Sequence, residues 1–182
     1  MRITGGSCKS VKIKSPRGSS VRPTSDKVRE ALFNILGPQI TGSLFVDGFA
    51  GSGVVGIEAL SRGAEYCYFI EQNKAWTKLI GDNLRKTGVE KKAVIINREI
   101  SRGFRKIAGE GRAVDYVFLD PPYNSFLHLK ACEEIFCQGL LKKEGVLILE
   151  HDSRTKVLLD NWHLIDQRWY GDTGLSLLQQ KT

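Results

Sequence analysis

The sequence is most informative at Val114-Asp115-Tyr116-Val117-Phe118-Leu119-Asp120-Pro121-Pro122-Tyr123. The apolar run has the length and the Val and aromatic content of a buried strand. Proline cannot donate a hydrogen bond to a neighbouring strand, so this strand has to end near Asp120 and turn sharply. The turn presents a carboxylate, stiffly held carbonyls and an aromatic ring, which together can hold a flat group that carries an amine. An ordinary strand exit with a helix-capping aspartate is the simpler alternative.

The sequence around this stretch alternates strands with helices. Strands are expected at 44–46, 66–70, 93–96, 114–120 and 145–149, and helices at 54–62, 74–86, 101–108 and 126–138. A first helix starts after Thr24 or Ser25 and ends at Gly37-Pro38, and a short one is expected near 155–160. Two alternating runs, 163–170 and 175–179, predict a C-terminal hairpin. The fold class is therefore α/β, with a mainly parallel sheet covered on both faces and an antiparallel hairpin at one edge.

Length and composition restrict the class of protein. The 182 residues, 41% of them hydrophobic, suffice for one domain with its own core. No window approaches the roughly 18 apolar residues of a membrane helix, and the polar start is unlike a signal peptide, so a cytoplasmic protein is expected. The four cysteines lack metal-ligand spacing, so no metal is expected. We expect a monomer, since no long apolar surface stripe is evident.

Positive charge is concentrated at the start of the chain. The net charge is +7, yet residues 1–25 hold six Lys and Arg residues and no acid. We therefore divide the chain into a basic extension, 1–23, and a main domain, 24–182. Such an extension suits a polyanionic partner, although a solvated tail would have the same composition. The candidate nucleic-acid contacts are Arg2, Lys9, Lys12, Lys14, Arg17, Arg22 and Arg29, of which Arg29 could instead pair with Asp26.

A glycine-rich loop follows the first expected strand. Gly51-Ser52-Gly53-Val54-Val55-Gly56 opens a helix, and Glu71 ends the next strand, where it could accept from ribose hydroxyls. A structural turn with a solvated glutamate is the alternative. Asp47 at the strand end would repel a pyrophosphate but attract a sulfonium or an ammonium group. This favours S-adenosylmethionine over a nicotinamide cofactor.

These motifs resemble those of a known family. Asp47-Gly48-Phe49-Ala50-Gly51-Ser52-Gly53 is similar to motif I of class I S-adenosylmethionine-dependent methyltransferases, and Asp120-Pro121-Pro122-Tyr123 to motif IV of those that methylate exocyclic amines. The whole chain resembles the RsmD family, which methylates guanine N2 in 16S ribosomal RNA. The stretch most specific to this family is 22–34, and the resemblance continues through 56–64 and Tyr170-Gly171-Asp172-Thr173.

The resemblance implies a seven-stranded, Rossmann-like class I fold whose N-terminal extension holds ribosomal RNA. In the implied site, Asp47, Gly51 and Gly53 line the methionine end of the cofactor, Glu71 takes the ribose and Glu99 faces the adenine amine. Phe49, Gln72 and Ile100 complete the expected cofactor-binding set, and Asp120, Pro121, Pro122 and Tyr123 form the catalytic set.

The expected partner is 16S rRNA or the small ribosomal subunit, and an assembly intermediate is also possible. In the expected mechanism Asp120 and the Pro121 carbonyl accept the hydrogens of guanine N2, and Tyr123 stacks on the base. Three alternatives stay open: a non-catalytic RNA-binding or ribosome assembly factor, an adenine-N6 DNA methyltransferase and, last, a small nicotinamide oxidoreductase.

Overall fold

The computed structural model describes residues 1–15, 25–121, 127–157 and 159–181. In the described ranges a single seven-stranded sheet has the order β3-β2-β1-β4-β5-β7-β6. The strands are β1 (Leu44–Gly48), β2 (Tyr66–Ile70), β3 (Ala93–Ile96), β4 (Val114–Leu119), β5 (Leu141–Asp152), β6 (Trp162–Tyr170) and β7 (Thr173–Gln180). Strands β1 to β5 pair in parallel, whereas β7 runs antiparallel to both β5 and β6. The predicted mainly parallel sheet with an antiparallel C-terminal hairpin is confirmed.

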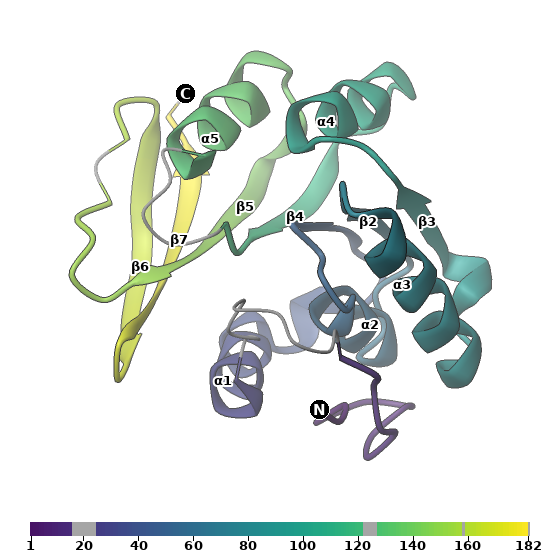
Figure 1. Ribbon diagram of the computed structural model, residues 1–182. Coiled ribbons are helices and arrows are strands. Elements are labelled where there is room, and N and C mark those ends of the chain that lie inside the picture. The colour runs from purple at the N-terminus through teal and green to yellow at the C-terminus, as the bar shows by residue number, and fades with distance from the viewer. Residues whose placement is uncertain (16–24, 122–126, 158, 182) are drawn as a thin grey trace.

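Helices cover both faces of the sheet (Figure 1). One face carries α1 (Asp26–Leu36), α2 (Val54–Ser61) and α3 (Lys74–Thr87), and the other carries α4 (Ile100–Gly109) and α5 (Leu127–Cys137). Two short 3-10 turns, Gly37–Ile40 and Glu90–Lys92, precede β1 and β3. Alternate strand residues supply the two cores: Phe45 packs with the α1–α3 layer, and Val46 with the α4–α5 layer. Because both faces are covered, the parallel strands read as near-continuous apolar runs.

Local signals explain where the helices begin and end. The Ser25 hydroxyl accepts a hydrogen bond from the Val28 amide at 3.2 Å, and the Asn73 side chain caps α3 in the same way. Gly88 ends α3 in the left-handed conformation, with φ of 72°. The expected cap at Ser25 and the glycine stop after α3 are therefore confirmed, whereas the alternative cap, Thr24, lies outside the described residues.

The first fifteen residues pack onto the main domain. The chain folds back on itself, with Ile3 and Val11 joined by a backbone hydrogen bond of 3.0 Å. Ile3, Cys8 and Ile13 are buried in the core that α1, α2 and α3 share. Arg2 and Lys12 form an isolated antiparallel bridge in this segment. Residues 1–15 are thus an integral layer over α2.

The structure corrects the expected helix near 155–160. The described residues 155–157, 159 and 160 form no helix. The carboxylate of Asp152 accepts hydrogen bonds from the Arg154 backbone and guanidinium at 2.8–2.9 Å, and its carbonyl accepts one from Thr155. These local bonds offer the backbone an alternative to the helix. Strand β5 is also longer than the expected 145–149, because its ends pair with Val114 and with β7.

Candidate active site

The sheet has a topological switch point between β1 and β4. The chain leaves β1 towards β2 and β3 on one side, then returns to form β4 on the other side. Gly48 pairs with Leu119 at the carboxyl ends of the two strands. In open α/β sheets ligands bind in the crevice outside such a point. The fold therefore brings the loop after Asp47 and the turn at Asp120 next to each other.

The loop after β1 has an unusual backbone. Phe49, Gly51 and Gly53 have φ angles of 61°, 55° and 75°. The left-handed backbone conformation of a phenylalanine costs about 1–3 kcal/mol, and residues strained in this way cluster at functional sites. A Cβ atom added to Gly51 would meet nothing closer than the Phe49 carbonyl oxygen at 3.9 Å. This open side of Gly51 allows a ligand to approach the backbone closely.

Asp47 lies buried beneath this loop. Its Oδ2 accepts a hydrogen bond from the Gly56 amide of α2 at 2.8 Å, and the residue is 2% exposed. Burial raises the pKa of Asp47 to about 8; the Gly56 hydrogen bond opposes this rise, and the negative charges of Asp120 and Glu71 add to it. Three carboxyl groups gathered in this way make a site where a positive charge is favourable.

Glu71 closes the loop from the end of β2. Its two carboxylate oxygens accept from the Gly51 amide at 3.0 Å and the Asn73 amide at 2.7 Å. Burial raises the pKa of Glu71, and three backbone hydrogen bonds oppose the rise. A carboxylate has about four acceptor positions, so this one can hold the loop and still accept from a ligand hydroxyl. The adjacent Gln72 is exposed.

The ends of β3 and α4 border the same crevice. The exposed Glu99 is the N-cap of α4, and its carbonyl accepts from the Gly103 amide at 2.9 Å. The next residue, Ile100, is buried, and its Cδ1 lies 3.1 Å from where a Cβ of Gly48 would stand. Ile100 therefore packs directly against the end of β1, and Glu99 is left at the rim.

The proline turn follows β4. Asp120 is half-buried, and Pro121 is buried. The contribution of Asp120 to the raised pKa of Asp47 shows that the two carboxyl groups interact electrostatically. Pro122 and Tyr123 lie outside the described residues.

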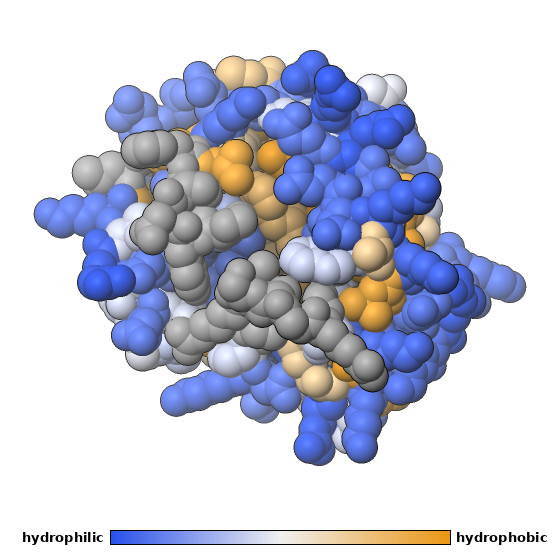
Figure 2. All heavy atoms as spheres, viewed as in Figure 1, coloured by the Kyte–Doolittle hydropathy of each residue, from blue (hydrophilic) through white to orange (hydrophobic). Residues whose placement is uncertain are grey.

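Figure 2 shows the surface of the molecule from the same side as Figure 1. On this face, apolar side chains gather between the α4–α5 layer and α1, and hydrophilic residues surround them.

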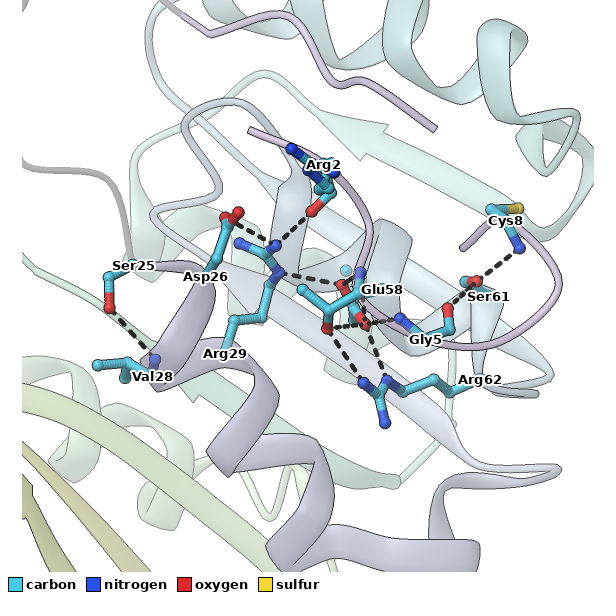
Figure 3. A network of polar contacts seen from close by, with 12 residues as sticks. Arg2, Gly5, Cys8, Ser25, Asp26, Val28, Arg29, Glu58, Ser61 and Arg62 are labelled. Atoms are coloured by element: carbon cyan, nitrogen blue, oxygen red, sulfur yellow. Dashed lines mark hydrogen bonds and ion pairs between the residues drawn. The ribbon is translucent and has the colours of Figure 1, made fainter. Parts of the chain in front are cut away.

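The predicted nucleic-acid contacts divide into three groups. Arg2, Lys9, Lys12 and Lys14 are exposed on the N-terminal segment, whereas Arg17 and Arg22 lie outside the described residues. Arg29 does not fit the prediction, because its side chain is fully buried. Its Nε binds Glu58 at 3.0 Å, and its Nη2 binds Asp26 at 3.0 Å and the Arg2 carbonyl (Figure 3).

The network of Figure 3 fastens the N-terminal segment to α2. The buried carboxylate of Glu58 accepts from the backbone amides of Thr4 and Gly5, the Thr4 hydroxyl and the side chains of Arg29 and Arg62. These hydrogen bonds lower the pKa of Glu58 despite the opposing effect of burial. Arg29 is therefore a buried counter-ion that positions Glu58.

Sequence reasoning missed two asparagines near the site. Asn97 Nδ2 donates to the carbonyls of Glu71 and Gln72 at 3.0 and 2.9 Å and so fixes the end of β2. Asn83, on α3, binds the N-terminal segment and the glycine loop. For Asn83 the sequence did contain a signal, since a polar residue occupies the apolar face of the amphipathic helix α3. The sequence did not show which groups this residue would bind.

Metal sites and membrane-spanning helices are both absent from the part of the chain that the structure describes. Among those residues, no group of three or more His, Cys, Asp or Glu residues could hold a metal ion. No helix within the described ranges is both long and apolar enough to cross a membrane. Cys8, Cys67 and Cys132 are buried free thiols, and Cys137 is an exposed one.

The glycine loop over a buried aspartate, the acid after β2 and the Asp-Pro turn after β4 together define a class I S-adenosylmethionine-dependent methyltransferase. More distant solved structures of such enzymes share this fold. The chain belongs to the family described as "Conserved hypothetical protein 95", whose model matches residues 1–179. The prediction of the RsmD family is confirmed, since relatives of that name match along the whole chain.

Three similar proteins illustrate the match. The chain is 34% identical to "Putative rRNA methyltransferase YlbH" of Bacillus subtilis, with 100% of both chains covered. It is 32% identical to "Ribosomal RNA small subunit methyltransferase D" of Escherichia coli K12, over 100% of this chain and 90% of the relative. The solved structure of a hypothetical protein from Thermus thermophilus is 29% identical with a TM-score of 0.85, covering 98% and 99% of the two chains.

Proposed function

We propose that the protein transfers the methyl group of S-adenosylmethionine to the exocyclic N2 of a guanine in 16S ribosomal RNA. One observation carries the proposal: the acidic glycine loop of β1 and the Asp-Pro turn of β4 lie at the ends of neighbouring strands. Neighbouring strands are about 4.8 Å apart, so a methyl donor at the loop and an amine at the turn would be in contact. The names of the relatives supply the RNA substrate.

The site residues fit the cofactor. S-adenosylmethionine supplies an electrophilic methyl group on a sulfonium, in a molecule that also carries an ammonium group and a ribose. The cluster of Asp47, Glu71 and Asp120 favours a cation. The open backbone at Gly51 supports close approach of the cofactor. In the proposal Glu71 would accept from the ribose hydroxyls, and Glu99, at the rim, would accept from the adenine amine.

Asp120 and Pro121 supply the acceptors for the target base. Guanine N2 is a weak nucleophile because its lone pair is delocalised into the ring. The Asp120 carboxylate and the Pro121 carbonyl would accept its two hydrogens and direct the lone pair towards the methyl donor. This is catalysis by positioning and electrostatic stabilisation, without a covalent intermediate on the protein. Tyr123 would stack on the base, which has to leave its helix to reach the crevice.

The exposed basic residues of the N-terminal segment would hold the RNA backbone. Arg2, Lys9, Lys12 and Lys14 are available for phosphates, and they carry no base-specific information by themselves. The choice of nucleotide then comes from the crevice and from the shape of the RNA around it. A small-subunit substrate and a monomeric enzyme complete the proposal.

The test is methyl transfer from labelled S-adenosylmethionine to small ribosomal subunits that lack the modification, followed by mapping of the labelled base. We expect label on one guanine N2. Asp120→Asn should reduce the rate by at least about 100-fold, while Asp115→Asn, at the opposite end of β4, should stay within a few-fold of wild type. Label on adenine of double-stranded DNA added in a parallel reaction, with none on the subunits, would favour the adenine-N6 DNA methyltransferase. Cofactor binding without transfer to any RNA would favour the non-catalytic factor.

A further inference from the structure

Asn83 lies between two segments that are far apart in the sequence. Its side chain is fully buried on α3. Oδ1 accepts from the Lys14 amide at 3.0 Å, and Nδ2 donates to the Lys14 carbonyl at 3.0 Å. Nδ2 also donates to the Ser52 carbonyl, in the glycine loop, at 2.9 Å. One amide group therefore joins the N-terminal segment to the loop that faces the cofactor.

The bonding capacity of this amide is well used. An asparagine side chain has two N–H donors, and both are engaged here, one by each segment. Burying an amide costs free energy unless the amide is hydrogen-bonded, whereas an apolar residue in the same space would carry no such cost. Helix α3 also supports the loop by packing, since a Cβ at Gly53 would lie 3.1 Å from Ile80 Cγ2.

The segment that Asn83 holds carries exposed positive charge. Lys12 and Lys14 are exposed, and the side chain of Ile13 between them is buried in the core. The backbone of this basic stretch is thus fixed, while the Lys12 side chain is exposed and the Lys14 ammonium lies 4.0 Å from the Asp82 carboxylate of α3. The same Nδ2 group bonds the carbonyls of Lys14 and Ser52, so one side chain links the position of the segment to that of the loop.

We propose that Asn83 is a positioning residue that couples the N-terminal segment to the cofactor loop, so that cofactor and RNA bind with positive cooperativity. This inference rests on the proposed function, which assigns RNA to the segment. Coupling between two sites is reciprocal, so each ligand should tighten the binding of the other by the same factor. Measured couplings of this kind are about 5- to 150-fold.

The coupling is measured by binding unmodified small ribosomal subunits to the protein with and without saturating S-adenosylhomocysteine, which occupies the cofactor site without turnover. For the wild type we expect binding that is tighter by at least about fivefold with S-adenosylhomocysteine. In Asn83→Ala we expect this ratio to fall to about one, although calorimetry still detects S-adenosylhomocysteine. The ratio is the informative quantity, because a purely structural role would weaken both ligands without changing it.

Ser61→Ala is the matched control. The Ser61 hydroxyl accepts from the Cys8 amide at 2.8 Å and donates to the Gly5 carbonyl at 2.6 Å, so it holds the same segment. It lies at the far end of α2 from the glycine loop. Ser61→Ala should therefore keep the wild-type ratio. A wild-type ratio of one, an unchanged ratio in Asn83→Ala or an equal loss in Ser61→Ala would overturn the proposal.

A second measurement needs no variant. Hydrogen exchange of the Lys14 amide reports its bond to Asn83, and S-adenosylhomocysteine alone should slow this exchange in the wild-type protein. Unchanged exchange at saturating ligand contradicts the coupling even if Asn83→Ala fails to fold. The two proposals fail separately: loss of methyl transfer to RNA contradicts the function, whereas intact transfer with no coupling contradicts only the role of Asn83.

Discussion

Asp47 is a carboxyl group whose chemistry depends on its surroundings. Burial raises its pKa to about 8, and the neighbouring carboxylates Asp120 and Glu71 contribute to the rise. The same group ionises near 3.8 in an exposed chain. Since the native state retains a proton that the unfolded state loses, the contribution of Asp47 to stability falls as the pH rises from about 4 to 8. A bound cation offsets this effect by favouring the ionised form.

Cofactor binding should therefore depend on pH. We expect the affinity for S-adenosylmethionine to increase from about pH 6 to about pH 8, because the sulfonium and ammonium groups favour ionised Asp47. Below about pH 8, where Asp47 of the free protein is protonated, binding of the cofactor should release a proton. Calorimetry in buffers of different ionisation enthalpy counts the proton. Asp47→Asn should bind more weakly and no longer release this proton. Release of the same size in the variant would contradict the assignment.

Arg29 shows why single residues are harder to predict than elements. Its position beside the basic extension suggested a phosphate contact, with a local pair to Asp26 as the alternative. The local pair exists, but the main partner, Glu58, lies 29 residues away on α2. That contact arises only when α1 packs beside α2. Removing one partner of such a buried pair typically costs about 3–5 kcal/mol, so Arg29 is expected to be structural.

At the scale of elements, composition was a reliable guide for short strands made of apolar and aromatic residues. The expected strands 66–70 and 93–96 match β2 and β3. Capping residues placed the ends of α1 and α3 within about one residue. Predictions were wrong where partners decide the structure: the ends of β5 form because β4 and β7 pair with them, and Asp152 replaces the expected C-terminal helix with a local turn.

Helix α2 packs closely against β2 beneath the cofactor loop. A Cβ at Gly56 would lie 2.4 Å from Phe69 Cε1 and 2.7 Å from Cys67 Sγ, and both atoms belong to the core. Gly56→Ala should therefore destabilise the protein by about 1–3 kcal/mol through overpacking. Urea denaturation measures this change. Increased stability of this variant would show that β2 and α2 can separate without an energetic penalty.

Gly81, on α3, provides the comparison for that measurement. A Cβ there meets no atom closer than 3.6 Å, and the residue is within a regular helix. Gly81→Ala should stabilise the protein by about 0.5–1 kcal/mol, because alanine loses less backbone entropy on folding. The two substitutions add the same methyl group, so opposite signs isolate the effect of close packing at α2.

For the molecule as a whole, charge is distributed unevenly between segments. The exposed Arg2, Lys9, Lys12 and Lys14 lie on a segment that the core holds in place through Ile3 and Ile13. A fixed array of cations pre-organises phosphate binding, and each neutralised phosphate releases counterions from the nucleic acid. The positive charge of this segment could be predicted from the sequence, but its fixed position on the main domain could not. The residues that hold it there, Ile3 and Ile13, are isolated apolar residues in a polar stretch.

RNA binding should weaken steeply with salt. Replacing Lys9, Lys12 and Lys14 by alanine should lower the slope of log affinity against log salt by about 0.7 for each phosphate that is no longer neutralised in single-stranded RNA. Filter binding of unmodified small subunits at several salt concentrations gives the slope. Lys142→Ala serves as control, since Lys142 lies outside the N-terminal segment, where it pairs with Asp115 at the starts of β4 and β5, and should leave the slope unchanged. An equal slope for the triple variant would contradict the role of the segment.

The position of β7 has a consequence for biosynthesis. This strand is the last of the sheet in chain order, yet it lies between β5 and β6 and provides the pairing of β6. During translation β6 therefore emerges before the strand that will hold it. The half of the sheet that borders the proline turn can therefore close only after β7 has been synthesised, so a truncation before Thr173 would leave both β5 and β6 without a partner on that side.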